Sequence, residues 1–146
     1  MPKWVTTAFE EYRKRLPKQC SLELIEISAK HRGKNADITR ILRDEALAIE
    51  QVVDSQQKLI ALDRKGKSLT TEQLAKYLRE WIDNNQDIAL VIGGPEGIAP
   101  ALLENAEQKW SLSAMTFAHP IVRVMVAEQV YRAWSILAGL PYHRGD

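Results

Sequence analysis

The sequence predicts a three-layer α/β domain around a parallel sheet, and three observations carry this prediction. Segments with the apolar, β-branched composition of strands alternate with segments of helical periodicity along the whole chain. The run at residues 88–92 is short, continuous and apolar, as in a strand that is covered on both faces. With 146 residues, of which 45% are hydrophobic and 27% charged, the chain fits one domain spanning residues 1–146.

The first half of the chain supplies two helices and two strands to this prediction. Residues 2–15 place apolar side chains at helical spacing, so they predict an amphipathic helix that a proline then stops. Residues 22–27 alternate between apolar and charged side chains, as a half-buried strand does. Asp37 is placed to cap a helix with a broad apolar stripe over residues 38–53. Residues 58–62 are the second predicted strand.

The second half begins with the best-marked helix of the chain. Thr70 and Gln73 have the spacing of a capping box ahead of a helix that ends near Asn84. The remaining predicted elements are the strand at residues 88–92, a short helix at 100–106, a strand at 110–117 and a final helix from Pro120 to about residue 138.

Composition excludes several classes of protein. No apolar run approaches the roughly 20 residues of a membrane span, and the N-terminus lacks the charged flank and apolar core of a secretory signal. We therefore expect a cytoplasmic protein without a membrane partner. Cys20 has no second cysteine to pair with, and no cluster of cysteine and histidine predicts a metal site, so we expect no catalytic role for Cys20.

The formal net charge of +1 excludes a strongly basic nucleic-acid binder but allows local phosphate-binding patches. Three short basic clusters lie in predicted loops or in the tail, at residues 30–34, 64–67 and 143–144. Each cluster taken alone fits ordinary solvated lysine and arginine. If the clusters converge on one face, they form a phosphate-binding surface.

The apolar run at residues 88–92 stops in a glycine-rich turn at residues 93–97. In open α/β sheets ligands collect beyond the carboxyl ends of such strands, and glycine lets a ligand approach the main chain closely. The turn has neither the dinucleotide fingerprint nor the phosphate-loop spacing, and Gly66-Lys67-Ser68 lacks the earlier glycine that a phosphate loop needs. The glycine turn is therefore either a ligand site or a tight structural turn.

The predicted final helix is apolar around nearly its full circumference, so more than one side of it must be covered. A second copy of the chain is the expected cover. Arg123, Glu128 and Arg132 would then be ions of the interface or site residues, although Glu128 and Arg132 are four residues apart and can instead pair with each other. We expect His119, just before Pro120, to cap or pack the helix rather than to act as a base.

Six segments match the pattern of one known protein family. The segments are Arg32-Gly33-Lys34-Asn35-Ala36-Asp37, Leu62-Asp63, Gly93-Gly94-Pro95-Glu96-Gly97, Trp110-Ser111-Leu112-Ser113-Ala114-Met115-Thr116, His119 to Ile136, and Pro141-Tyr142-His143-Arg144. In these segments the chain closely resembles the RlmH family, ribosomal RNA methyltransferases of the knotted SPOUT class that are specific for N3 of pseudouridine, and the likeness covers essentially the whole chain.

The resemblance implies a homodimer, formed through the final helix, that holds S-adenosylmethionine in a deep C-terminal trefoil knot. Such a knot is an exception to the rule that chains are not threaded. Apolar Leu62, Leu112 and Met115 would hold the adenine, while Gly93 would let the bent methionine approach the main chain. The complete implied cofactor lining is Leu62, Gly93, Leu112, Ser113, Ala114, Met115, Thr116 and Phe117.

The implied reaction transfers a methyl group from a sulfonium to a ring nitrogen of a modified uridine. The substrate would be a hairpin loop of large-subunit (23S) ribosomal RNA, recognised in assembled ribosomes. The nitrogen must lose a proton, and we expect His143, in a flexible tail, to remove it. We expect Arg144 to grip a phosphate or to stabilise the imide anion. Alternatively, these two tail residues contact solvent or the partner subunit.

The chain departs from the family at its start, where the family has a further strand ahead of the segment that begins at Met1. This departure matches the predicted pattern, which opens with a helix as if a doubly wound unit lacked its first strand. That strand would lie between residues 22–27 and 88–92, and its loss would leave main-chain groups unpaired on both neighbours. We therefore expect Met1 to be an internal methionine. The alternative function is a catalytically impaired RNA- or ribosome-binding protein with the same fold.

Overall fold

The structure, a computed structural model, describes residues 1–27, 37–94 and 96–144. The chain separates into two compact units, and each unit draws on segments that are far apart in the sequence. The helical unit comprises Met1–Leu24, Leu69–Gln86 and Thr116–Asp146, and the sheet unit comprises Ile25–Ser68 and Asp87–Met115.

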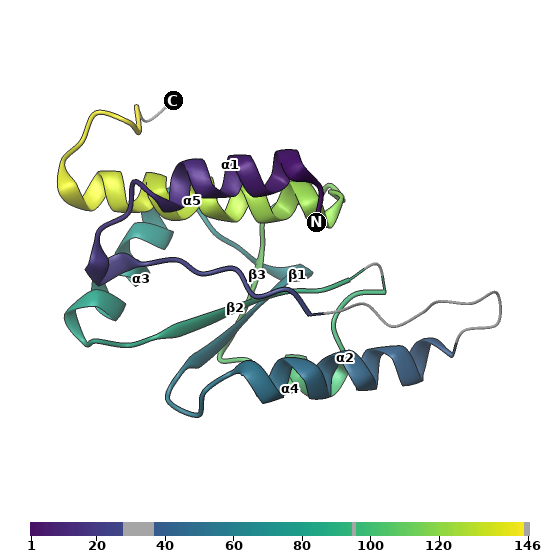
Figure 1. The fold of residues 1–146 in the computed structure, drawn as a ribbon. Coiled ribbons are helices and arrows are strands. Elements are labelled where there is room, and N and C mark those ends of the chain that lie inside the picture. The colour runs from purple at the N-terminus through teal and green to yellow at the C-terminus, as the bar shows by residue number, and fades with distance from the viewer. Residues whose placement is uncertain (28–36, 95, 145–146) are drawn as a thin grey trace. The chain divides into compact units, whose positions relative to one another are not determined.

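Three parallel strands form the sheet of the sheet unit (Figure 1). β1 (Lys58–Ser68) lies between β2 (Ile88–Ile92) and β3 (Gln108–Ser111), so the strand order is β2-β1-β3. Helices α2 (Ile38–Val52) and α4 (Pro100–Asn105) belong to the same unit. An all-parallel sheet in a chain that alternates strands with helices confirms the predicted α/β class.

The core of the sheet unit joins its two helices to its strands. Ile60 and Ala61 of β1 are almost fully buried, as expected for the middle strand of a covered parallel sheet. Each large apolar side chain buried in this way contributes roughly 1.5–3 kcal/mol to folding. A second cluster packs α2 and α4 against β2, and its buried members are Ala46, Val91, Ala99 and Leu102.

β1 is longer than the predicted strand at residues 58–62, because it continues through the basic stretch to Ser68. The prediction of a loop at residues 64–67 is therefore wrong. Gly66 allows the continued pairing: a Cβ at this position would lie 2.6 Å from the main-chain carbonyl carbon of Lys109. Glycine without a Cβ lets the two backbones touch there, so a polar stretch remains in the sheet.

In the helical unit, α1 (Lys3–Arg13) and α3 (Thr71–Asp83) both pack against α5 (His119–Ala138). Figure 1 shows α1 running alongside α5. A short 3-10 helix, η1 (Lys18–Cys20), follows α1. Small side chains at the helix contacts allow close approach. The buried members of this core are Cys20, Ala75, Leu78 and Ala133.

The predicted signals for helix ends are confirmed. The Asp37 carboxylate accepts a hydrogen bond from the main-chain N–H of Arg40 at 3.3 Å, which caps α2. Thr70 and Gln73 form both bonds of the capping box: the Gln73 N–H donates to the threonine hydroxyl at 3.1 Å, and the Thr70 N–H donates to the glutamine carbonyl at 2.8 Å. α5 ends at Gly139, which has a left-handed φ of +70°.

Two predicted strands differ from the structure. Residues 22–27 form no strand, because a strand requires a hydrogen-bonded neighbour and no described segment pairs with these residues. The strand predicted at residues 110–117 is instead β3, which begins at Gln108 and ends at Ser111. Beyond Ser111, serine hydroxyls bond the main chain locally and so end the ladder. The single domain, the three-layer arrangement, the knot and the missing opening strand stay predictions.

Cys20 belongs to the core of the helical unit and is only 8% exposed. Burial raises the pKa of its thiol to about 11, so the thiol remains protonated at neutral pH. Because the thiolate is the reactive form of cysteine, this environment fits the expectation that Cys20 has no catalytic role.

Replacing Thr70 by alanine tests the capping box. The variant leaves the N–H of Gln73 without its side-chain acceptor, so we expect the free energy of unfolding to fall by about 1 kcal/mol. Urea denaturation followed by circular dichroism measures the change. Thr70→Ser keeps the hydroxyl and should retain most of the stability, and a Thr70→Ala variant as stable as the wild type would contradict the capping role.

Candidate functional site

The sheet brings three predicted cofactor positions to one edge. In the register of β1, Leu62 lies beside both Ile92, the last residue of β2, and Trp110 near the end of β3. Gly93 follows Ile92 directly, and Leu112 follows Trp110 by two residues. These positions therefore gather where β2 and β3 reach their carboxyl ends, the edge at which open α/β sheets bind ligands.

The glycine turn after β2 folds back on itself. The N–H of Gly97 donates to the carbonyl of Gly94 at 2.9 Å, and Gly97 has a φ of +87°. A Cβ on Gly93 would lie 2.7 Å from the main-chain carbonyl carbon of Gly97 and 2.8 Å from the side chain of Ile98. The turn thus requires glycine for its own packing.

The loop after β3 presents apolar side chains to solvent. Ser111 donates to the carbonyl of Ser113 at 3.0 Å, and the Ser113 hydroxyl accepts from the N–H of Met115 at 3.0 Å. These bonds hold the loop, while Leu112 and Met115 are 40% and 71% exposed. Ala114 between them is exposed as well. Clustered apolar exposure of this kind marks a surface that a ligand or partner covers.

The remaining predicted site residues fall in the helical unit. Thr116 and Phe117 lie just ahead of α5, and His143 and Arg144 lie in the tail that follows it. The basic cluster predicted at residues 30–34 lies outside the described residues. The structure thus divides the predicted site between an apolar sheet edge and a polar tail, and the predicted convergence of the three basic clusters stays a prediction.

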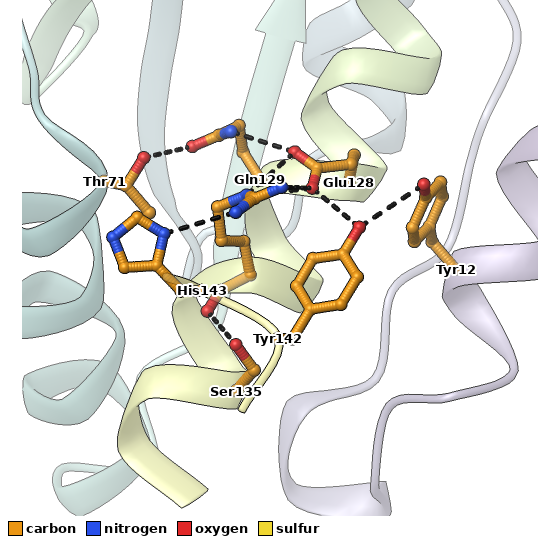
Figure 2. A network of polar contacts seen from close by, with 8 residues as sticks. Tyr12, Thr71, Glu128, Gln129, Ser135, Tyr142 and His143 are labelled. Carbon is orange, nitrogen blue, oxygen red and sulfur yellow. Dashed lines mark hydrogen bonds and ion pairs between the residues drawn. The ribbon is translucent and has the colours of Figure 1, made fainter. Parts of the chain in front are cut away.

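A network of polar contacts in the helical unit is centred on the carboxylate of Glu128 (Figure 2). Arg132, one turn later on α5, donates to one carboxylate oxygen through Nε and Nη2 at 2.9 Å each. Gln129 donates to the other oxygen at 2.9 Å and accepts from the Thr71 hydroxyl at 2.7 Å. The tail residue Tyr142 also donates to Glu128, at 2.9 Å. The pairing of Glu128 with Arg132, which the sequence left as an alternative to an interface role, is confirmed.

Tyr142 fixes the tail to α5 through both its hydroxyl and its ring. Its proton goes to Glu128 because a carboxylate only accepts, so the hydroxyl of Tyr12, 3.4 Å away, is placed to donate to Tyr142. Burial is the main cause that raises the pKa of Tyr142 well above its usual value, and the hydrogen bond that it donates to the carboxylate of Glu128 adds to this rise. Its ring meets that of Tyr131 edge-on at 4.8 Å, and the guanidinium of Arg132 lies 4.7 Å from the ring centroid.

Both ring nitrogens of His143 are engaged. Nδ1 lies 3.3 Å from Nη1 of Arg132, and Nε2 lies 2.9 Å from a carboxylate oxygen of Glu72 in α3. Because a guanidinium only donates, Nδ1 must accept and Nε2 carries the proton. The hydrogen bond from His143 is the main cause that lowers the pKa of Glu72. Through these two contacts His143 holds the tail to both α3 and α5.

The contacts of the tail were the part of the site that sequence reasoning missed. The sequence predicts a flexible tail, whereas Tyr142 and His143 are bonded to helices. Tyr12 and Glu72 lie 130 and 71 residues away from their tail partners, a separation that no local pattern reveals. Arg144 is exposed, and no described residue forms a hydrogen bond or ion pair with its guanidinium.

His119 is the first residue of α5 and is half-buried. The N-cap is Ala118, whose side chain accepts no hydrogen bond. Of the two roles expected for His119, capping is therefore wrong, and packing fits its burial.

Residues 1–27, 37–94 and 96–144 were searched for metal sites, membrane-spanning helices and cavities. No three histidine, cysteine, aspartate or glutamate side chains gather there as metal ligands. In the same part of the chain, no helix has the length and apolar character needed to cross a membrane. A cavity of about 240 Å³ lies against α1, and its lining includes the charged residues Glu10, Arg13 and Glu23, of which Glu10 and Arg13 pair with each other at 2.7 Å.

A comparison with protein families identifies the class of this chain. The family model described as "Predicted SPOUT methyltransferase" matches residues 1–143. The chain therefore belongs to the SPOUT methyltransferase family.

Proteins named ribosomal RNA large subunit methyltransferase H are similar over nearly the whole chain. Those of Hydrogenovibrio crunogenus and Thioalkalivibrio sulfidiphilus are each 50% identical over 144 residues, which cover 99% of this chain and 92% of the relative. That of Pseudomonas putida is 48% identical over 144 residues, covering 99% of this chain and 93% of the relative. These comparisons confirm the resemblance to the RlmH family.

Replacing Tyr142 by phenylalanine tests its hydrogen bond and its raised pKa. At neutral pH the lost bond to Glu128 should lower the free energy of unfolding by about 1 kcal/mol. The pKa of Tyr142 is higher in the folded state than in the unfolded chain, where a tyrosine has a pKa of about 10. Below that pH the stability contributed by this shift is fully present, and it is lost as pH rises further. Phenylalanine cannot ionise, so Tyr142→Phe should lose less stability with alkali than the wild type does.

Urea denaturation at a series of alkaline pH values measures this difference. If the free energy of unfolding falls equally with rising pH in the wild type and in Tyr142→Phe, folding does not raise the pKa of Tyr142. Glu128→Gln removes the charge of the acceptor and should also loosen the tail.

Proposed function

We propose that this chain is an S-adenosylmethionine-dependent methyltransferase that modifies N3 of a pseudouridine in large-subunit ribosomal RNA, in the cytoplasm. The family match over residues 1–143 carries the proposal, because it includes every residue assigned to the cofactor and also His143. The name of the relatives supplies the substrate, ribosomal RNA of the large subunit.

The sheet edge suits the chemistry of the cofactor. S-adenosylmethionine, when bound, supplies a methyl group that is already activated on a sulfonium. Leu112 and Met115 offer exposed apolar side chains to an adenine ring, and covering one such side chain contributes roughly 1.5–3 kcal/mol. Leu62 adds a half-buried apolar side chain beside Ile92. Gly93 follows β2 directly at the same edge, and we assign its main-chain groups to the polar end of the cofactor.

The tail supplies the proton chemistry. The ring nitrogen of the substrate must lose a proton before it accepts a methyl group, and we assign its removal to Nδ1 of His143. Glu72 holds the proton of His143 on Nε2, which keeps Nδ1 as the basic nitrogen. Nδ1 accepts from Arg132 in this structure, so the substrate must replace that contact. Arg144, which is exposed, binds a phosphate or stabilises the imide anion.

α5 supports a homodimer. Ile121 is 44% exposed, and most other apolar side chains of this helix are only half-buried within one chain. A helix that is apolar on all sides must be covered on more than one side. A second copy that packs along α5 supplies this cover.

Titration calorimetry with S-adenosylmethionine and methyl transfer to purified ribosomes test the proposed function. We expect binding of the cofactor and incorporation of methyl groups into large-subunit RNA. His143→Ala and Arg144→Ala should keep cofactor affinity and lower the rate of transfer, by about 100-fold or more for the histidine if it is the base. RNA binding without cofactor binding or transfer would instead favour the catalytically impaired RNA-binding protein.

Met115→Ala tests the sheet edge as the cofactor site. Met115 is 71% exposed, so its truncation should leave the free energy of unfolding unchanged within about 0.5 kcal/mol. Lost cover over the adenine should nevertheless weaken S-adenosylmethionine binding by about tenfold or more. Leu47→Ala is the matched control, because Leu47 of α2 is also exposed, at 53%, and has no assigned role. Equal cofactor affinity in the two variants would remove Met115 from the site.

A further inference from the structure

β1 continues past Leu62, one of the proposed cofactor residues, and this continuation carries several cationic side chains. Arg64, Lys65 and Lys67 follow Leu62 on the same strand and are exposed. Lys109 on the neighbouring strand β3 is exposed as well. Arg64, Lys65, Lys67 and Lys109 are named the basic bulge below. The roles assigned so far to the cofactor residues and to the tail leave these four residues unused.

The backbone explains why these residues project from the regular sheet. In the register of β1 and β3, Leu62 and Lys67 both lie beside Trp110. The register therefore shifts between Leu62 and Lys67, and the residues between them interrupt the regular ladder as in a large β-bulge, a feature that re-aims side chains. Gly66 anchors the bulge, because its main chain lies against the peptide that joins Lys109 to Trp110. The four cations are thus carried by two neighbouring strands.

The two strands themselves contain more cationic than anionic side chains. Asp63 is the one carboxylate in β1, so the four cations and this anion leave a net charge of +3. Glu107, just ahead of β3, pairs with Lys58 at the opposite end of β1, at 3.4 Å.

We propose that the basic bulge binds phosphate groups of the RNA substrate and so orients the RNA at the sheet edge. The inference rests on the proposed function and adds to it a contact surface for the substrate. Lysine ammonium groups bind phosphates as point charges and read no sequence, so the recognised chemistry is the phosphodiester backbone. Position supports this assignment, since the bulge begins directly after Leu62, one of the proposed cofactor residues.

The variant Lys65→Ala/Lys67→Ala tests the proposal and leaves the cofactor and tail residues intact. We expect the Kd for protein-free large-subunit ribosomal RNA to rise about tenfold at roughly 0.1 M salt. The slope of log Kd against log salt concentration should fall by about 1 to 2, because two phosphate contacts no longer release counterions. The same loss should be seen with assembled ribosomes. Filter binding at several salt concentrations measures both quantities.

Two control variants separate local from general effects of charge. Lys3→Ala/Lys76→Ala removes the same charge from exposed positions on α1 and α3, and should leave Kd unchanged within about twofold. Lys65→Arg/Lys67→Arg keeps the charge of the bulge and should bind like the wild type. Cofactor titration and thermal unfolding of each variant verify that the fold is intact.

Three outcomes overturn the proposal. The first is an unchanged RNA affinity and salt slope in Lys65→Ala/Lys67→Ala. The second is an equal loss in Lys3→Ala/Lys76→Ala, which would make net charge alone the cause. The third is lost affinity for ribosomes with full affinity for protein-free RNA, which would assign the bulge to a ribosomal protein. The proposed function is tested separately, by the methyl transfer activity of the wild type. The RNA-binding measurements do not depend on that activity.

Discussion

The parallel pairing of β1 with β2 on one side and with β3 on the other is the constraint on which the candidate site in the sheet unit depends. Because Leu62 is in register with both Ile92 and Trp110, the chain leaves β2 and β3 at the same level of the sheet. The glycine turn and the serine-containing loop therefore emerge at one edge, although they are distant in sequence. A slip of one residue in either pairing would reverse the face on which every side chain of that strand lies.

In the helical unit a single carboxylate has a comparable organising effect. Glu128 only accepts hydrogen bonds, and it receives them from its own helix and from the tail. The side chains of Glu128 and Arg132 are 19% and 28% exposed, so their attraction is screened less than that of a surface pair. Tyr142 bonds to α5 and the next residue, His143, contacts both α3 and α5, so consecutive residues of the tail are held by two helices.

The sequence correctly predicted those features that depend on residues close together in the chain. The capping box of Thr70 and Gln73 and the cap by Asp37 involve residues three apart, and the sequence alone placed them correctly. The parallel sheet followed from the order of the elements. By contrast, the strand predicted at residues 22–27 has no described partner, since pairing depends on a distant segment that the pattern of one strand does not contain.

In the candidate site, too, the features that depend on contacts between distant segments were the ones that the sequence did not predict. Leu62, Gly93 and the loop from Leu112 were placed by resemblance to a family, and the strand register then brought them to one edge. The continuation of β1 through residues 64–67 was missed, because its lysines and glycine have the composition of a loop. What keeps that stretch in the sheet is contact between two backbones at Gly66, which composition does not express. The bond between Glu72 and His143 was missed for a related reason, since it spans 71 residues.

The contact at Gly66 also determines which positions of this stretch tolerate substitution and which position requires glycine. Any Cβ at position 66 would strike the main chain of Lys109, whereas Lys65 and Lys67 on either side carry exposed side chains. Charge can therefore be gained or lost at the neighbouring positions over evolutionary time without refolding the strand. Related chains should therefore keep glycine at this point, whereas the charge of the two neighbouring side chains can vary without a change in the backbone.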